Sequence, residues 1–241
     1  MKTYNFKRVM VWELPVRIFH WLNVFAVIVL TITGFIIADP PAIISSSQEA
    51  TNTHYFGYVR FIHFVSAYVF LFVMIMRIYW LFVGNRFASW RAFWPFRKAF
   101  WRNFSHVLKM DIFLQNEKVE DVTKISIGHN SIAKISYIAM FFIAILMIIT
   151  GFGLYADMSS WWLPKSFKWV VPFFGGDYLV RTIHHVCMWL FIFFAMVHVY
   201  LVMYHDWLEG RGEVSSMVGG YKFVREDRLR EEDKVKDIDT L

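Results

Sequence analysis

The sequence contains a single cysteine, Cys187, among its 241 residues. One thiol cannot form an internal disulfide, so disulfide bonds do not hold this fold together. It also excludes a C-x-x-C-H site for covalent c-type haem, so a haem here would be held by ligation alone. The chain has no Gly-rich phosphate loop, no G-x-S-x-G motif and no H-E-x-x-H motif, which removes common signatures of nucleotide binding, ester hydrolysis and zinc proteolysis.

Charged residues are scarce at 18%, whereas 57% of the residues are hydrophobic and 20% are aromatic. A helix needs about 20 apolar residues to cross the hydrocarbon core of a bilayer. Four windows meet this requirement, and none contains Asp or Glu: 18–38, 60–83, 132–156 and 182–204. The sequence therefore predicts an all-α fold, a transmembrane four-helix bundle of multi-pass type.

The distribution of Lys and Arg predicts how these helices are oriented. The N-terminal 17 residues carry four, the loop 39–59 none, the loop 84–131 eight and the loop 157–181 three. Because basic residues concentrate in cytoplasmic loops, we expect both termini and the second loop in the cytoplasm, and an inner-membrane location.

Two polar segments accompany the spans. Residues 89–114 mix Trp and Phe with Arg and Lys, which predicts an amphipathic segment lying in the cytoplasmic interface between helices 2 and 3; a folded cytoplasmic loop is the alternative. We expect residues 1–205 to form the membrane domain and residues 206–241 a polar cytoplasmic tail. The sequence does not decide whether this tail binds a partner or is disordered.

Histidines are expensive in hydrocarbon and therefore mark candidate functional sites. In the predicted topology His63 and His184 lie near the periplasm, and His20 and His198 lie near the cytoplasm. His184 and His198 are 14 residues apart, which is about 21 Å along a helix and nearly the same face. The sequence thus predicts two cross-helix pairs, His63 with His184 and His20 with His198, at two depths.

Paired imidazoles facing each other across a bundle suit the iron of a haem, whereas a zinc site usually needs three or four protein ligands. Two axial ligands leave no open position on the iron, so such a centre transfers electrons. The alternative for each histidine is a hydrogen-bonded packing role. His185 competes with His184, although it is turned about 100° away from the stripe that His198 shares. For the remaining histidines we expect ordinary surface roles: His54, His106, His129 and His205.

Arginines and glycines complete the candidate site. Arg77 follows His63 by 14 residues, so its guanidinium is a candidate for binding haem propionates; the alternative is an arginine that snorkels to the headgroups. Arg17 and Arg60 are further propionate candidates. Gly34 and Gly151 lie in a short internal repeat, "ITGFIIAD" at 32–39 and "ITGFGLYAD" at 149–157. They would allow close approach of a haem, or simply of another helix.

Several stretches together resemble the di-haem cytochrome b subunit of membrane-bound nickel–iron hydrogenases, from about residue 10 to 222. They are "ELPVRIFHWLN", "GYVRFIHFVSAYVF…MRIYWLFVGNRF", "IGHNSIA", "HHVCMWL…VHVYL" and "SSMVGGYK". The chain is more distantly similar to the cytochrome b subunits of formate dehydrogenases.

The resemblance implies two haem b groups with the ligand pairs given above. It implies a periplasmic partner consisting of an iron–sulfur small subunit and a nickel–iron large subunit, and a quinone acceptor, menaquinone or ubiquinone. We therefore expect an electron-transfer subunit that is not a hydrogenase by itself, with lipid contacts and no nucleic-acid partner. The alternatives are the cytochrome of a formate dehydrogenase or another periplasmic oxidoreductase, and a haem-free transporter that uses its histidines.

Overall fold

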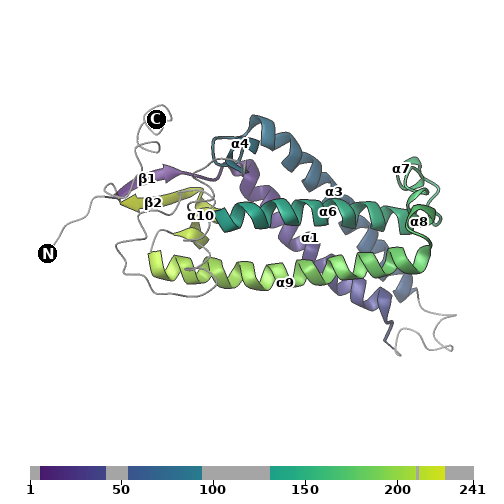
Figure 1. Cartoon of the computed structure of the whole chain (residues 1–241). Coiled ribbons are helices and arrows are strands. Elements are labelled where there is room, and N and C mark those ends of the chain that lie inside the picture. The colour runs from purple at the N-terminus through teal and green to yellow at the C-terminus, as the bar shows by residue number, and fades with distance from the viewer. Residues whose placement is uncertain (1–5, 42–53, 94–130, 210–211, 226–241) are drawn as a thin grey trace. The chain divides into compact units, whose positions relative to one another are not determined.

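A computed structural model describes residues 6–41, 54–93, 131–209 and 212–225, and four long helices dominate it (Figure 1). They are α1 (Leu14–Ala38), α3 (Tyr55–Val83), α6 (Ser131–Tyr155) and α9 (Asp177–Glu209). All four are long and apolar enough to cross a membrane, which confirms the predicted helical membrane fold. With 33 residues, α9 is about 50 Å long and exceeds the roughly 30 Å of hydrocarbon that it has to cross.

The described residues form two compact units. The core unit comprises the described residues of 18–79 and 142–191, and the ribbon unit comprises those of 1–17, 80–141 and 192–241. The predicted interfacial segment 89–114 lies mostly outside the described residues. Its described part, in the ribbon unit, contains the short helix α4 (Trp90–Phe93).

The core unit is built around apolar contacts to which all four long helices contribute. Its centre is a buried cluster of Ala26, Phe70 and Ala144, and Phe191 packs against it. These residues come from α1, α3, α6 and α9 respectively. Because the helix faces that meet here are apolar, packing of this kind holds spans together without buried charge.

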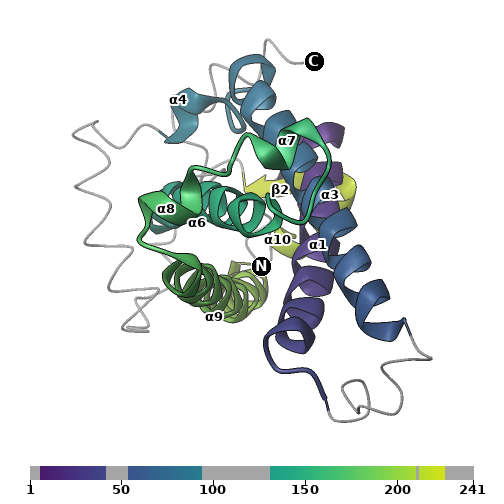
Figure 2. The same cartoon turned by 90° about the vertical axis from the view of Figure 1, so that its right-hand side faces the viewer.

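Two short helices, α7 (Trp162–Lys165) and α8 (Val170–Phe173), connect α6 to α9 along the chain and lie at the end of α6 in the core unit (Figure 2). Val170 is fully buried against the last turns of α6. A Cβ at Gly153 would lie 2.7 Å from Cβ of Val170. Only glycine at this position lets the two backbones come so close.

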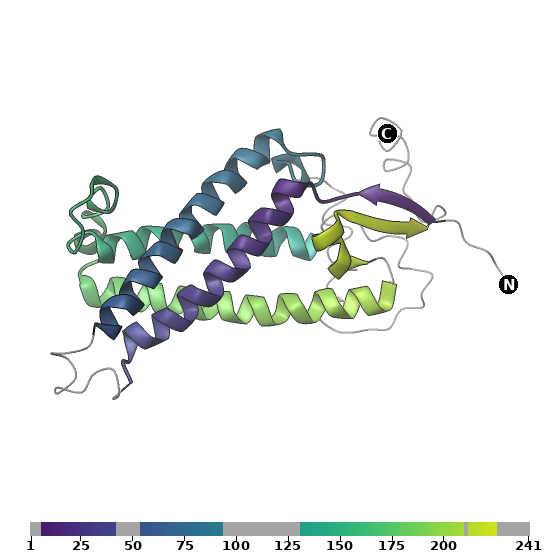
Figure 3. The same ribbon diagram turned by 180° about the vertical axis from the view of Figure 1, so that it is seen from behind.

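The ribbon unit contains a two-stranded antiparallel sheet that the sequence analysis did not predict (Figure 3). Strand β1 (Phe6–Met10) pairs with β2 (Tyr221–Arg225), so that Phe6 faces Arg225 and Met10 faces Tyr221. The backbone N–H groups of Val11 and Trp12 both donate to the carbonyl of Gly220, at 2.9 and 3.1 Å. The residues before α1 are therefore hydrogen-bonded to the residues that follow α9.

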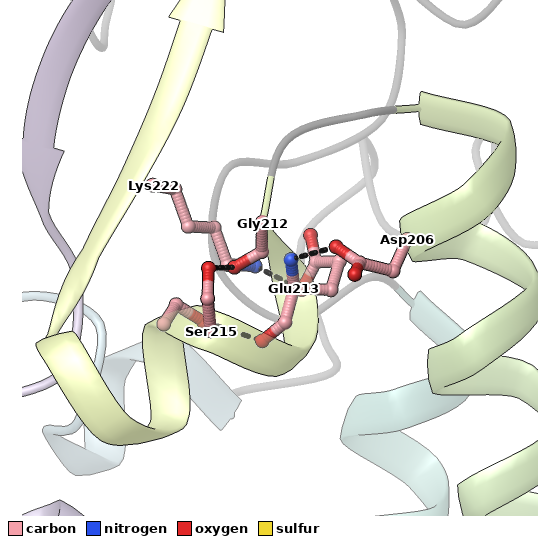
Figure 4. Close-up of polar contacts among 6 residues, drawn as sticks. Asp206, Gly212, Glu213, Ser215 and Lys222 are labelled. Carbon is pink, nitrogen blue, oxygen red and sulfur yellow. Dashed lines mark hydrogen bonds and ion pairs between the residues drawn. The ribbon is translucent and has the colours of Figure 1, made fainter.

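The connection from α9 to β2 is a short helix, α10 (Glu213–Gly219), held by charged contacts (Figure 4). Asp206 accepts a hydrogen bond from the backbone N–H of Glu213. Nζ of Lys222, which is only 2% exposed, lies 2.5 Å from the Glu213 carboxylate. The predicted tail 206–241 thus includes the end of α9 together with α10 and β2, and its role as a separate region stays a prediction.

Candidate functional site

His63 on α3 is held by a threonine of α1 within the core unit. Its Nδ1 lies 2.8 Å from Oγ1 of Thr33, and the same Oγ1 lies 2.6 Å from the carbonyl oxygen of Val29 in its own helix. The next residue, Gly34, faces the same ring, because a Cβ there would lie 3.6 Å from Cε1 of His63 and 3.7 Å from Sδ of Met188. The first ITGF segment therefore packs directly on a candidate ligand.

His184 on α9 is held in the same way by α6. Its Nδ1 lies 2.9 Å from Oγ1 of Thr150, and that Oγ1 lies 2.7 Å from the carbonyl oxygen of Leu146. A Cβ at Gly151 would lie 3.1 Å from Cε1 of His184. Gly34 faces Met188, one turn after His184 on α9, as well as His63, so both predicted ligands belong to the same part of the core unit.

The neighbouring histidine, His185, has different surroundings. Its ring meets Phe35 edge-on with centroids 6.1 Å apart, and it lies 6.5 Å from the ring of Trp189. It therefore faces aromatic side chains, while His184 faces the threonine and the glycine of the second ITGF segment. The environments of the two rings favour His184 as the partner of His63.

The other predicted pair falls in different units. His20 belongs to the core unit, where its ring meets that of Trp21 edge-on at 5.3 Å. His198 belongs to the ribbon unit, where its ring stacks on Phe194, with centroids 5.4 Å apart and an interplanar angle of 14°. The pairing of His20 with His198 stays a prediction.

Comparison with known proteins places this sequence in a family. A family model described as prokaryotic cytochrome b561 matches residues 11–220. The chain belongs to the prokaryotic cytochrome b561 family. Membership implies haem b as the prosthetic group and, with the four apolar helices, a multi-pass membrane protein.

Curated relatives of this cytochrome b561 chain match over almost its whole length. A protein of Azotobacter chroococcum mcd 1 is 37% identical over 224 residues, covering 91% of this chain and 90% of the relative. One of Escherichia coli K12 is 39% identical over 217 residues, covering 88% and 89%. The first is named as a probable Ni/Fe-hydrogenase B-type cytochrome subunit and the second as a probable Ni/Fe-hydrogenase 1 B-type cytochrome subunit, which confirms the resemblance predicted from the sequence.

The arginines predicted at the site of this cytochrome b561 chain occupy three different settings. Arg60 lies over the ring of Phe56 on α3, 4.8 Å from its centroid. Arg77 is partly buried on the same helix. Arg17, in the ribbon unit, donates a hydrogen bond from Nη1 to the carbonyl of Val218. Their predicted contacts with propionates stay predictions.

Two of the four remaining histidines of this cytochrome b561 chain are described. The carbonyl of His54 accepts a hydrogen bond from the backbone of Tyr58, near the start of α3. The ring of His205 lies 5.7 Å from that of Tyr204 near the end of α9. His106 and His129 lie outside the described residues.

Sequence reasoning missed Thr33 and Thr150 in this cytochrome b561 chain. The glycines of the repeated ITGF segment were predicted site residues, and the threonine that precedes each glycine is repeated in the same way. A threonine in an apolar helix usually bonds to its own backbone, so the motif alone did not point to a histidine. The contacts to His63 and His184 required the placement of α3 and α9.

Proposed function

We propose that this chain is the membrane subunit that carries electrons from a nickel–iron hydrogenase to quinone. The observation that carries the proposal is the match to cytochrome subunits of that name over about nine tenths of both chains, 91% and 90% for the relative from Azotobacter chroococcum. The paired histidines of the core unit support it. Hydrogen oxidation yields two electrons and two protons, and quinone reduction consumes the same numbers.

His63 and His184 are the proposed axial ligands of one haem b. Their Nδ1 atoms are bonded to threonines, and within the described residues Nε2 of neither ring makes a hydrogen bond, so this nitrogen is available to iron. Gly34 and Gly151 keep side chains away from the ring edges. Two imidazoles that present Nε2 match the donor set that a haem iron takes from a protein, and a haem held by them would supply a reversible one-electron centre.

His20 and His198 are the proposed ligands of a second haem b nearer the cytoplasm. The proposal rests on the spacing of 14 residues between His184 and His198 on one helix, which returns the two side chains to one face. Arg17, Arg60 and Arg77 are the proposed partners of the propionates, since guanidinium groups bind carboxylates through charge-assisted hydrogen bonds.

The distribution of basic residues supports an inner-membrane orientation with both termini in the cytoplasm. In this orientation the His63 and His184 level faces the periplasm, where the iron–sulfur and nickel–iron subunits would dock. Electrons would enter there and leave to quinone, menaquinone or ubiquinone, at the level of His20 and His198.

Optical spectroscopy of the purified chain tests the proposal. The reduced-minus-oxidised spectrum should be that of bis-histidine haem b, with two haems per polypeptide. His20→Ala and His198→Ala should each leave one haem and abolish quinone reduction, while His54→Ala, which changes a histidine outside the predicted pairs, should keep both. A colourless protein, or two haems retained in the His20 and His198 variants, would overturn the assignment.

The partner is tested in membranes that contain the whole complex. Hydrogen gas should reduce the haem absorbance of this chain, and formate should not. Reduction of the haem by formate and not by hydrogen would show that the partner is a formate dehydrogenase and not a hydrogenase.

A further inference from the structure

Thr33 and Thr150 occupy equivalent positions next to the two candidate ligands of the core unit. We propose that they are positioning residues that fix both axial imidazoles of one haem and lower its reduction potential. The inference rests on the proposed ligation by His63 and His184, and it adds the residues that control the electronic state of these ligands.

The direction of each hydrogen bond follows from counting hydrogens. A threonine hydroxyl has one hydrogen to donate and two lone pairs to accept with. Thr33 Oγ1 lies 2.6 Å from the carbonyl oxygen of Val29, and a carbonyl can only accept. The hydroxyl hydrogen is therefore used in its own helix, and the 2.8 Å contact with His63 must be a bond donated by Nδ1–H.

The same count applies to the second copy. Thr150 donates to the carbonyl of Leu146 at 2.7 Å, so Nδ1–H of His184 donates to Thr150 at 2.9 Å. In both rings the proton is on Nδ1 and the lone pair is on Nε2. The threonines thus select the tautomer that presents Nε2 to a metal, before any metal binds.

The same bond also changes the strength of the ligand. A hydroxyl that already donates to a carbonyl is a better acceptor, because hydrogen bonds in a chain polarise one another. A stronger bond from Nδ1–H raises the basicity of the imidazole. A more basic axial ligand stabilises the ferric state, so each threonine should lower the reduction potential of the haem.

Burial and repetition argue against a purely local role for these hydroxyls. Thr33 is 7% exposed and Thr150 is fully buried, and each precedes a glycine whose Cα faces the same ring. Thr182 on α9 shows the ordinary local role, because it is exposed and its hydroxyl donates to the carbonyl of Tyr178, one turn earlier in the same helix, at 2.9 Å.

Substitutions that remove only the hydroxyl test this role. Thr33→Val and Thr150→Val keep the shape of the side chain, Thr33→Ser and Thr150→Ser keep the hydroxyl, and Thr182→Val is the matched control. The readouts are a potentiometric titration of both haems, the electron paramagnetic resonance spectrum of the ferric haems and the rate of haem release.

Each valine variant should raise the potential of one haem, and both should act on the same haem because their histidines share one iron. The double variant should shift it further in the same direction, and the affinity for this haem should fall by about 10–100-fold. The serine variants and Thr182→Val should behave like the wild type. The second haem should keep its potential throughout.

Unchanged potentials and spectra in both valine variants, with two haems bound, would overturn the inference while leaving the proposed function intact. Shifts of two different haems would show that His63 and His184 do not share an iron. A wild-type chain without bis-histidine haem would instead overturn the proposed function itself.

Discussion

Substitution of the two site glycines by alanine should change stability to different extents. A Cβ at Gly34 would lie 3.6 Å from Cε1 of His63, and a Cβ at Gly151 would lie 3.1 Å from Cε1 of His184. Carbon atoms in contact prefer separations of about 3.5–4.0 Å. Gly34→Ala therefore fits without movement, whereas Gly151→Ala requires the His184 ring to move by about 0.4–0.9 Å.

The size of the difference follows from two opposing terms. Alanine is favoured over glycine in a helix interior by about 1 kcal/mol, and this gain is common to both variants. Overpacking in a filled site costs about 1–3 kcal/mol and applies to Gly151→Ala alone. His184 cannot move freely, because its Nδ1 is bonded to Thr150 at 2.9 Å. We expect Gly34→Ala to be more stable than the wild type, and Gly151→Ala to be less stable than Gly34→Ala by about 1–3 kcal/mol.

Thermal unfolding of the purified protein in lipid–detergent micelles measures this difference, followed by circular dichroism and by the absorbance of bound haem. Gly151→Ala should also release haem faster, because the displaced ring no longer aims Nε2 along its original direction. Equal stability and equal haem retention in the two variants would refute the contact between Gly151 and His184.

Two further substitutions test packing away from the histidines. Gly153→Ala should destabilise the packing of Val170 on α6, because its Cβ would lie 2.7 Å from both Cβ and Cγ1 of Val170. Val170→Gly, which removes both of these atoms, should restore part of the stability in the double variant. Limited proteolysis after residue 160 measures this, and no recovery in the double variant would contradict the contact. Lys222→Ala removes one partner of an ion pair, a change that costs about 3–5 kcal/mol when the charge left behind is buried. Because Glu213 is 25% exposed, we expect the ribbon unit to be destabilised by the lower end of this range. Lys222→Ala combined with Glu213→Gln should recover part of this loss in thermal unfolding, and an unchanged midpoint in the single variant would show that the ion pair is dispensable.

The spans were predictable because the property that defines them is local. About 20 consecutive apolar residues are sufficient to identify a membrane helix, and each of the four windows satisfied this criterion alone. The pairing of β1 with β2 was not predictable on the same basis. Phe6 and Arg225 face each other although they are separated by almost the whole chain, and five-residue strands carry little periodic signal of their own.

The candidate site was predictable only in part for a related reason. Spacing on one helix selected His184 and placed His198 on the same stripe, because helix geometry is fixed by the backbone. What each ring contacts depends on a second helix, whose rotation the sequence does not specify. The role of Thr150 beside His184, and the aromatic surroundings of His185, therefore emerged only from the packing of α6 and α1 against α9.

The two threonine–histidine contacts also explain why the ITGF segment occurs twice. One helix pair, α1 with α3, orients His63, and a second pair, α6 with α9, orients His184. Each pair positions one imidazole whose tautomer is set locally, and in the proposed ligation the two pairs together would provide both ligands of one haem. Within each helix pair the threonine hydroxyl donates to a carbonyl and Nδ1–H of the histidine donates to the threonine. Holding these side chains in an apolar environment therefore leaves neither of these two donors without a hydrogen bond. The rings can thus be held in a binding geometry before haem arrives, which reduces the ordering that haem binding itself must accomplish.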